Sequence, residues 1–415
     1  MEHEIRYLNA LGLQMLRDLP PLESGCAAIV ILPVRNEEAL LGETLRALRD
    51  QLSDAGHPLD STRYEVLTLV NNSCDASAAI ARDFANAHPH FRLHVQEEEL
   101  PEPLAHVGAA RRILMDLACR RFRSLHRSDG LIASTDADTV PAPDWISAML
   151  RAVEDGADAV GGRILFRLEE LRALPQSIRV PYLQDVSYRY LAAELAARLD
   201  PRPEDPWPHH FQNFGASMAV TAAAYAQVGG LPVRSSLEDV ALFDALERFD
   251  ARIRRPIDVR VHTSPRLDGK TSFGLAVQLC QWRAGVEAGD CVLVPPAQAI
   301  VRHAMARKML RGIWKSHQDT SPHDAARLLG LDASTLWEAI GTSNYLGELW
   351  QKIGGPTNAA GCPPEYHVPI TVAIGQLRAM LSSLRPGERP VFKAREEIQP
   401  VAGIQRSPSM LQPPG

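Results

Sequence analysis

The chain has 415 residues, of which 45% are hydrophobic and 23% are charged, as is ordinary for a soluble globular enzyme. Its formal net charge of -6 provides no global basic field, so we expect no binding of nucleic acid. The six cysteines form no C-x-x-C pair and fit neither a zinc site nor a disulfide framework.

Apolar runs alternate with helical patterns over the first part of the chain. The expected strands are 26–34, 64–70, 91–99, 130–138 and 157–166, and the expected helices are 35–52, 77–88, 106–122 and 142–156. This alternation predicts a doubly wound, mostly parallel α/β sheet.

After residue 270 the pattern becomes helical, and from about residue 385 the chain is rich in Pro, Gly, Ser and Gln. The expected division is an N-terminal extension (1–25), a sheet domain (26–270), a helical accessory region (271–385) and a flexible tail (386–415). One basic helical stretch, 300–317, could lie on an anionic membrane, but packing of its apolar face onto its own domain is the preferred interpretation.

The N-terminus lacks the apolar core of a signal peptide, and no run approaches the ~18 to 20 apolar residues of a membrane-spanning helix. We therefore expect a cytoplasmic protein with reduced cysteines and no transmembrane segment. Peripheral contact with a membrane is left open.

Two aspartates, Asp136 and Asp138, follow the apolar run 131–135, where a buried strand should stop. In an open parallel sheet, ligands bind at the carboxyl ends of the strands. Two close carboxylates repel each other and lose hydration, and a divalent cation such as Mg²⁺ or Mn²⁺ removes that cost. The pair therefore indicates a metal that holds a diphosphate; the alternative is that both residues cap the following turn.

Four motifs follow one another along the chain: ILPVRNEEALL, VNNSCDAS, TDADTVPAPDW and GASMAVTAAAYAQVGGLPVRSSLEDVAL. Together they resemble the family 2 glycosyltransferases, which have the GT-A nucleotide-diphospho-sugar transferase fold. The resemblance covers roughly residues 26–270. It implies a Rossmann-like, mostly parallel sheet, to which this chain would add a C-terminal helical region.

The resemblance also implies which residues surround the nucleotide-sugar. They are Pro33, Arg35 and Glu37 after the first strand, Asn71 and Asn72 after the second, Arg111 near a phosphate, and Asp136 near the ribose. Asparagines stand where the family commonly has two aspartates, so the base, uracil or guanine, stays open. Each residue also has a purely structural interpretation as a helix first-turn acid, a turn former or a solvated arginine.

For the chemistry, the resemblance makes Asp138 the direct metal ligand, with Asp136 reaching the ribose or the metal through water. His262 is placed to complete the metal shell, or to end a strand as an ordinary histidine. Asp239 would accept the proton of the acceptor hydroxyl, and Glu238 would help to hold the acceptor. The alternative for the last two is an acidic pair in the first turn of a helix.

The expected function is transfer of one sugar from a UDP- or GDP-sugar to an acceptor hydroxyl, with Mg²⁺ or Mn²⁺ and with inversion at the anomeric carbon. A retaining enzyme similar to the glucosyl-3-phosphoglycerate and mannosylglycerate synthases is the main alternative, favoured by His262 beside Asp138 and by Asp239 far from the acceptor. A nucleotidyltransferase is less favoured because PVRNEEALL lacks a Gly-rich basic loop. A non-catalytic binding module would require the acids to be dispersed in space.

Overall fold

The computed structural model describes residues 2–269, 274–316, 322–354, 362 and 364–384. The chain forms two compact units, and neither is continuous in sequence. The first contains Met1–Glu170, Gln212–Glu247 and Ala251–Pro265, and the second contains Leu171–Phe211, Arg248–Asp250 and Arg266–Gly415. The domain limits expected from the sequence stay a prediction, and the tail 386–415 lies outside the described residues.

A seven-stranded sheet forms the centre of the first unit, in the order β3-β2-β1-β4-β8-β6-β9. The strands are β1 (Ala28–Val34), β2 (Tyr64–Asn71), β3 (Leu93–Glu98), β4 (Leu131–Thr135), β6 (Ala159–Gly161), β8 (Ser217–Thr221) and β9 (Ile253–Arg254). Only β8 runs antiparallel to its neighbours, β4 and β6. The predicted mostly parallel α/β sheet is therefore confirmed.

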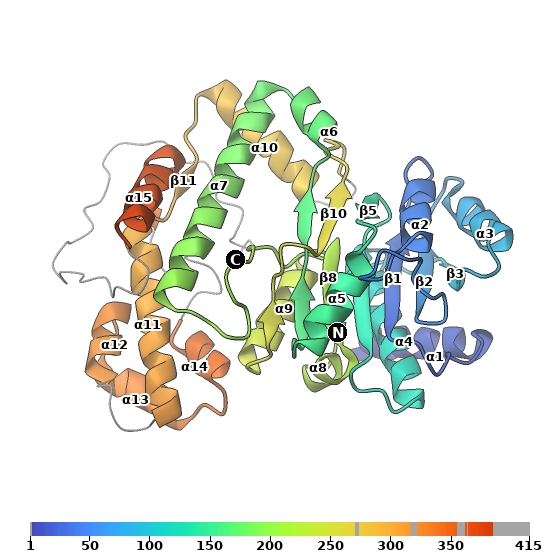
Figure 1. Cartoon of the computed structure of the whole chain (residues 1–415), viewed down its shortest axis with the longest axis horizontal. Helices are drawn as coiled ribbons and strands as arrows, with labels where there is room; N and C mark the ends of the chain where they lie inside the picture. Colours follow the sequence, from blue (N-terminus) through green and yellow to red (C-terminus); the bar gives the residue numbers. More distant parts are fainter. Residues whose placement is uncertain (1, 270–273, 317–321, 355–361, 363, 385–415) are drawn as a thin grey trace. The chain divides into compact units, whose positions relative to one another are not determined.

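Both faces of this sheet are covered, which explains why its strands are continuous apolar runs rather than alternating ones. The helices are α1 (Glu2–Asp18), α2 (Leu41–Arg49), α3 (Ser77–Ala87), α4 (Val107–Ser124), α5 (Trp145–Glu154), α8 (Ala222–Gln227) and α9 (Glu238–Arg248). Ile29 and Ile31 of β1 pack into one core with α1, α4, α8 and α9, whereas Val30 and Leu32 pack into the other with α2, α3 and α5. Figure 1 shows α2 and α3 close to β1 and β2.

The expected N-terminal extension is a helix that packs on the sheet domain. Leu8, Leu11 and Met15 of α1 are buried in the core that contains α4. A second, three-stranded sheet has the order β5-β10-β7, with β5 (Thr139–Pro141), β7 (Arg163–Leu165) and β10 (Arg260–Thr263). Because β5 begins directly after Asp138, this small sheet fixes the chain that leaves β4.

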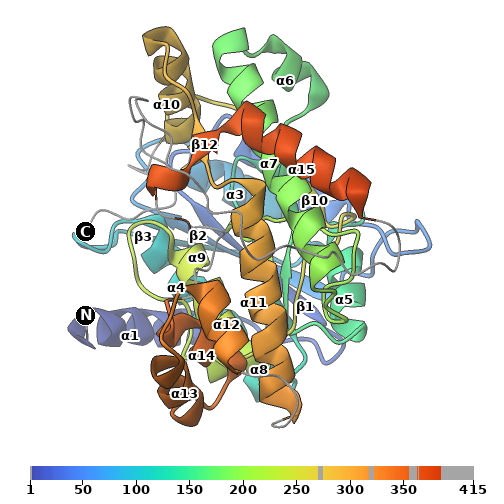
Figure 2. The same ribbon diagram turned by 90° about the vertical axis from the view of Figure 1, so that its left-hand side faces the viewer.

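The second unit is mainly helical, as predicted for the C-terminal region. Its helices are α7 (Gln176–Leu199), α10 (Leu275–Ala288), α11 (Ala297–Ser316), α12 (Pro322–Leu329), α13 (Ala333–Gly341), α14 (Leu346–Lys352) and α15 (Ile370–Ser383). The strands β11 (Leu293–Val294) and β12 (Val368–Pro369) pair beside them, and α6 (Leu168–Ala173) lies where the chain passes between the units. One core joins α7, α11 and α15, which lie side by side in Figure 2. Another core joins α11, α12, α13 and α14.

Helix α11 contains the basic stretch noted in the sequence. Its Ile300, Val301 and Leu310 are buried in the two helical cores, and Arg311 forms an ion pair with Asp200 at 2.7 Å. The helix thus packs onto its own unit, in agreement with the preferred interpretation. None of the helices in the residues that the structure describes is both long enough and apolar enough to span a bilayer.

Candidate active site

The carboxyl ends of β1, β2 and β4 lie at one edge of the central sheet. Their register pairs Ala28 with both Tyr64 and Leu131, so the three strands start level and run in the same direction. Asp136 and Asp138 directly follow β4 at this edge. This is the position at which parallel α/β sheets bind ligands.

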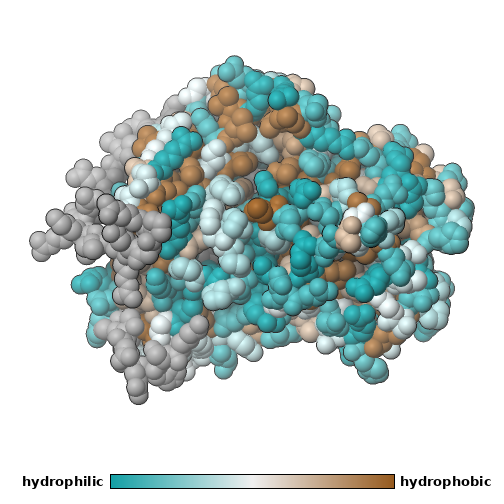
Figure 3. All heavy atoms as spheres, in the orientation of Figure 1, coloured by the Kyte–Doolittle hydropathy of each residue, from teal (hydrophilic) through white to brown (hydrophobic). Residues whose placement is uncertain are grey.

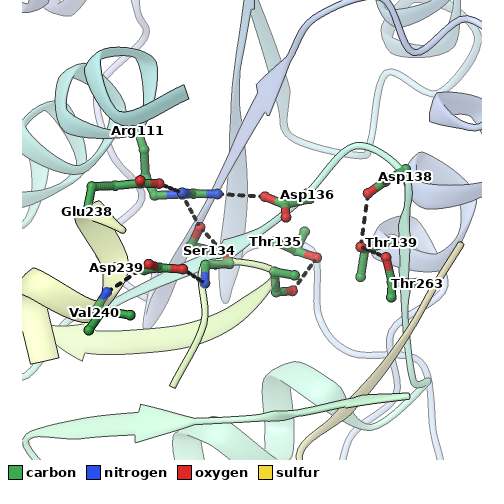
Figure 4. A network of polar contacts seen from close by, with 12 residues as sticks. Arg111, Ser134, Thr135, Asp136, Asp138, Thr139, Glu238, Asp239, Val240 and Thr263 are labelled. Atoms are coloured by element: carbon green, nitrogen blue, oxygen red, sulfur yellow. Dashed lines mark hydrogen bonds and ion pairs between the residues drawn. The ribbon is translucent and has the colours of Figure 1, made fainter. Parts of the chain in front are cut away.

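Arg111 of α4 links carboxylates from two separate segments (Figure 4). Its guanidinium donates to Asp136 at 2.6 Å and to Ser134 Oγ at 3.2 Å, and it also forms an ion pair with Glu238 at the start of α9. The side chains of Arg111 and Glu238 are almost fully buried, with 3% and 4% of their surface exposed. The sequence had suggested this arginine for a phosphate, and the structure places it between two acids.

Burial raises the pKa of both the Asp136 and Glu238 carboxyl groups, the charge of Arg111 opposes that rise, and the neighbouring Asp239 adds to it. Three acids thus surround one buried cation. Arg111 is therefore the group that allows these acids to lie close together in the folded protein.

Asp239 is oriented by the backbone. Its Oδ2 accepts a hydrogen bond of 2.7 Å from the N–H of Gly215, and its Oδ1 accepts one of 2.7 Å from the N–H of Val240 (Figure 4). The carbonyl of Gly215 accepts from Ser134 Oγ at 2.9 Å. Gly215 therefore ties the start of α9 to the end of β4.

Gly215 is a site residue that the sequence analysis missed. A Cβ at this position would lie 2.6 to 2.7 Å from the guanidinium atoms of Arg111, well inside van der Waals contact. Only glycine allows the backbone to approach the arginine this closely. The sequence shows the GAS motif that contains Gly215. Arg111, which Gly215 approaches in the fold, lies more than a hundred residues earlier in the chain.

Asp138 directly precedes β5 of the small sheet, and His262 lies on β10, which pairs with β5. The Oγ1 of Thr139 lies 3.2 Å from Asp138 Oδ1 and 3.1 Å from Thr263 Oγ1 (Figure 4). His262 pairs with Val140, two residues after Asp138, so the two candidate ligands come from adjacent segments of the chain. Burial lowers the pKa of His262, as do two nearby arginines, which favours the neutral imidazole that binds metals.

The donor set at this edge fits a metal that binds together with its substrate. Across the part of the chain that the structure describes, no group of three or more His, Cys, Asp or Glu side chains is arranged to hold a metal ion. Asp138 and His262 would supply two ligands. Mg²⁺ usually takes one or two protein carboxylates and fills its remaining positions with water and phosphate oxygens. These residues therefore fit an ion that arrives with a diphosphate better than a resident one.

The loops after β1 and β2 are joined to each other. Asn36, in the left-handed region with φ 53°, accepts a hydrogen bond of 2.8 Å from the N–H of Cys74 and donates its own N–H to Ser73 Oγ at 3.0 Å. Glu38 donates its N–H to Asp75 Oδ2 at 3.0 Å and accepts from the N–H of Ala76 at 3.0 Å. We call these two loops, residues 35–40 after β1 and 72–76 after β2, the β1–β2 rim. Asn36 was missed from the sequence, although asparagine commonly adopts this conformation.

The predicted nucleotide residues take different positions around this rim. Pro33 lies within β1, paired with Leu69 and buried, and Arg35 donates to the carbonyl of Ala105 at 2.7 Å. The N–H of Glu37 donates to Ser77 Oγ at 2.8 Å, and its side chain is largely buried. Arg35 and Glu37 thus belong to the rim, whereas Pro33 lies in the sheet below it.

Asn71 ends β2 and Asn72 directly follows it, and their side chains contact each other. Asn72, with φ 49°, donates to the carbonyl of Leu100 at 2.9 Å and accepts from its N–H at 3.2 Å, and it also accepts from Asn71 Nδ2 at 3.3 Å. The Asn72 amide therefore holds the loop after β3. A base contact by Asn72 would have to share or replace these bonds.

Comparisons with known proteins agree with the motifs. Residues 29–218 match the family described as Glycosyl transferase family 2. The predicted resemblance to the family 2 glycosyltransferases is therefore confirmed for this segment, which makes up a little under half of the chain. Glycosyltransferase AglE of Haloferax volcanii is 27% identical over 139 residues. That similarity covers 33% of this chain and 39% of AglE, well under half of the relative's length.

Solved structures of glycosyltransferases are similar at low identity. The mannosyltransferase PcManGT from Pyrobaculum calidifontis, in complex with GDP-Man and Mn²⁺, is 17% identical, with a TM-score of 0.42, over 91% of this chain and 92% of that one. S. aureus TarS 1–349, in complex with UDP-GlcNAc, is 16% identical with a TM-score of 0.42, over 79% and 89% of the two chains. The ligands named here are those bound by PcManGT and by TarS.

Proposed function

We propose that this protein transfers one sugar from a UDP- or GDP-sugar to an acceptor hydroxyl, with Mg²⁺ or Mn²⁺ and with inversion at the anomeric carbon. The observation that carries the proposal is the meeting of the predicted acids at one sheet edge. Asp136 and Asp138 follow β4, Glu238 and Asp239 start α9, and Arg111 and Gly215 connect the two segments. A dispersed arrangement would have favoured a non-catalytic module.

Each residue then has a distinct role. Asp138 and His262 would hold the cation, which when bound neutralises the diphosphate and stabilises its departure. Asp239, half-buried and oriented by two backbone N–H groups, would accept the proton of the acceptor hydroxyl. Glu238 is buried against Arg111, so we assign it to positioning that arginine rather than to holding the acceptor.

A retaining reaction is the second candidate, because His262 lies on β10, which pairs with the strand that directly follows Asp138. The configuration of the product at the anomeric carbon, read by proton NMR early in the reaction, separates the two. An inverted product supports Asp239 as the base, and a retained product moves the assignment to the second candidate.

Donor binding is tested by thermal unfolding of the full chain with Mn²⁺ and a panel of UDP- and GDP-sugars. A donor at about a hundred times its Kd should add about 2.7 kcal/mol of stability. We expect Asp138→Asn to abolish this gain, because the cation loses its carboxylate. Asp83→Asn, an exposed aspartate on α3, is the matched control and should keep it. The proposal fails if no donor stabilises the protein, or if Asp138→Asn responds as the wild type does.

A further inference from the structure

Leu237, the residue directly before α9, has a backbone conformation that leucine rarely adopts. Its φ is 58°, and its carbonyl accepts a hydrogen bond of 3.0 Å from the N–H of Ala241, the first of the helix. The other non-glycine residues at positive φ, among those that the structure describes, are Asn36, Asn72, His126 and Asp250. Asparagine, aspartate and histidine tolerate this conformation, whereas a bulky leucine is strained in it. The surrounding fold must therefore impose it.

The loop that leads to Leu237 is fixed on helix α4. We call residues 228–237 the α8–α9 loop. Arg112 of α4 donates to the carbonyl of the buried Leu231 at 2.8 Å, and Asp116 holds that guanidinium at 2.7 Å. Further along the loop, the carbonyl of Arg234 lies against Gly108, where a Cβ would be only 1.9 Å from that oxygen. The loop is thus held at two points before it reaches α9.

The chain returns to α4 at the first residue of α9. Glu238 pairs with Arg111, and the next residue, Asp239, accepts a hydrogen bond of 2.7 Å from the N–H of Gly215 (Figure 4). Consecutive residues of an α-helix point about 100° apart, so both contacts form only when the helix starts in one orientation. With the α8–α9 loop fixed, that orientation depends on the backbone angles of Leu237. A negative φ there would turn α9 and break at least one of the two contacts.

The side chain of Leu237 gives no comparable reason for its place. It is half-buried, and among the residues that the structure describes it is not part of either hydrophobic core of the first unit. Apolar side chains are scattered among hydrophilic ones over the face drawn in Figure 3. Partly exposed apolar residues are normal on a protein surface and need no partner. The unusual feature of Leu237 is therefore its backbone.

We propose that Leu237 is a positioning residue, whose positive φ aims the carboxylate of Asp239 at the reacting hydroxyl. This inference rests on the proposed function, in which Asp239 accepts the proton of that hydroxyl. Proton transfer requires the base within hydrogen-bonding reach, and a misplacement of about 1 Å can cost about a hundredfold in rate. The strain at Leu237 is kept because the fixed loop and the two contacts at the start of α9 outweigh it.

The test compares Leu237→Asn with Leu237→Val in the full chain with Mn²⁺. Turnover is read as nucleoside diphosphate released from the UDP- or GDP-sugar that most stabilises the chain, with water as the acceptor. Asparagine tolerates positive φ and β-branched valine opposes it, so Leu237→Asn should keep kcat near the wild-type value and Leu237→Val should lower it about tenfold to a hundredfold. The donor KM should change little in either variant, because the residues proposed to hold the donor and the cation are unchanged. A packing role for the side chain predicts the opposite order, since only valine is apolar.

Thermal unfolding gives a second readout that does not depend on activity. Leu237→Gly should melt above Leu237→Ala, because glycine adopts positive φ without steric cost. Glycine is also favoured over alanine before a helix in general, so a matched position is needed. Leu40 provides it, since it is a half-buried leucine directly before α2 with an ordinary φ of -116°. The advantage of glycine over alanine should be larger at Leu237 than at Leu40 by about 2–4 °C.

The outcomes separate this inference from the proposed function. It is overturned alone if Asp239→Asn is inactive while Leu237→Val turns over as fast as Leu237→Asn. It is also overturned if glycine has the same advantage over alanine at Leu237 and at Leu40. Near-normal turnover of Asp239→Asn, or a wild type that releases no nucleoside diphosphate from any donor, would overturn the proposed function and this inference with it.

Discussion

Replacement of Arg111 by methionine tests whether this residue holds the acids of the candidate site together. The change removes the charge but keeps an unbranched side chain of similar length. It leaves Glu238, with 4% of its side chain exposed, without a cation, whereas Asp136 keeps 37% exposed and can be hydrated. Removal of one partner of a buried ion pair costs about 3–5 kcal/mol. Since only Glu238 is deeply buried, we expect the lower end, about 3 kcal/mol.

The assay is hydrogen exchange as a function of urea, read on peptides from β4 and α9, so that the first unit is followed separately from the second. Arg111→Met with Glu238→Gln should recover about 1–3 kcal/mol, because the buried charge is then removed as well. A loss below about 1 kcal/mol in the single variant would refute the reasoning, since the carboxylates would then not depend on Arg111.

Arg121→Met is the matched control on the same helix. Arg121 binds Glu65 through two hydrogen bonds, and both side chains are as deeply buried as those of Arg111 and Glu238. This variant should also lose stability, because the buried Glu65 carboxylate loses its arginine and keeps only its contact with His94. It should nevertheless keep the stabilisation by donor and Mn²⁺, whereas Arg111→Met should lose it. If donor and Mn²⁺ stabilise both variants equally, Arg111 does not contribute to the donor site.

Three further outcomes are expected. Gly215→Ala should cost about 1–3 kcal/mol in thermal unfolding, because its methyl group would overlap the guanidinium of Arg111, whereas Gly375→Ala in the open middle of α15 should gain about 0.5–1 kcal/mol. Burial raises the pKa of Glu65, but hydrogen bonds from a histidine and an arginine outweigh it and leave that pKa below its ordinary 4.5. The stability difference between the wild type and Glu65→Gln should thus be full at neutral pH and should shrink as the pH falls below 4.5 in urea titrations at several pH values; a difference that grows in acid would contradict this. Asp239→Asn should lower kcat by about 10²–10⁴ while donor-induced stabilisation persists, and near-normal turnover would exclude it as the base.

Strands covered on both faces were the easiest elements to predict from the sequence. The runs expected at 26–34 and 64–70 agree within two residues with β1 and β2, because burial on both sides requires continuous apolar sequence. The helix expected to start at residue 35 begins only at Leu41, since the rim bonds of Asn36 hold the preceding residues in a loop. The strand expected at 157–166 is split between two sheets, and Gly162 at the break approaches Ser217 too closely for a side chain.

The acids of the candidate site were predictable because they follow strand and helix boundaries, which a single sequence reveals. Their connection was not predictable, because Arg111 and Glu238 are 127 residues apart in the chain. An arginine on a helix pattern gives no sign of whether it will meet solvent, a phosphate or a carboxylate. Only the folded sheet brings the start of α9 beside the end of β4.

The bonded β1–β2 rim has a consequence for how quickly a ligand can be captured. Two loops that already satisfy each other's backbone groups have little freedom left to lose when a nucleotide arrives. Association at this edge is then governed by diffusion and charge rather than by a search among loop conformations. With the proposed nucleotide site at this rim, we expect selection among bases to come from the fixed outline of the two loops rather than from their adaptation to each base.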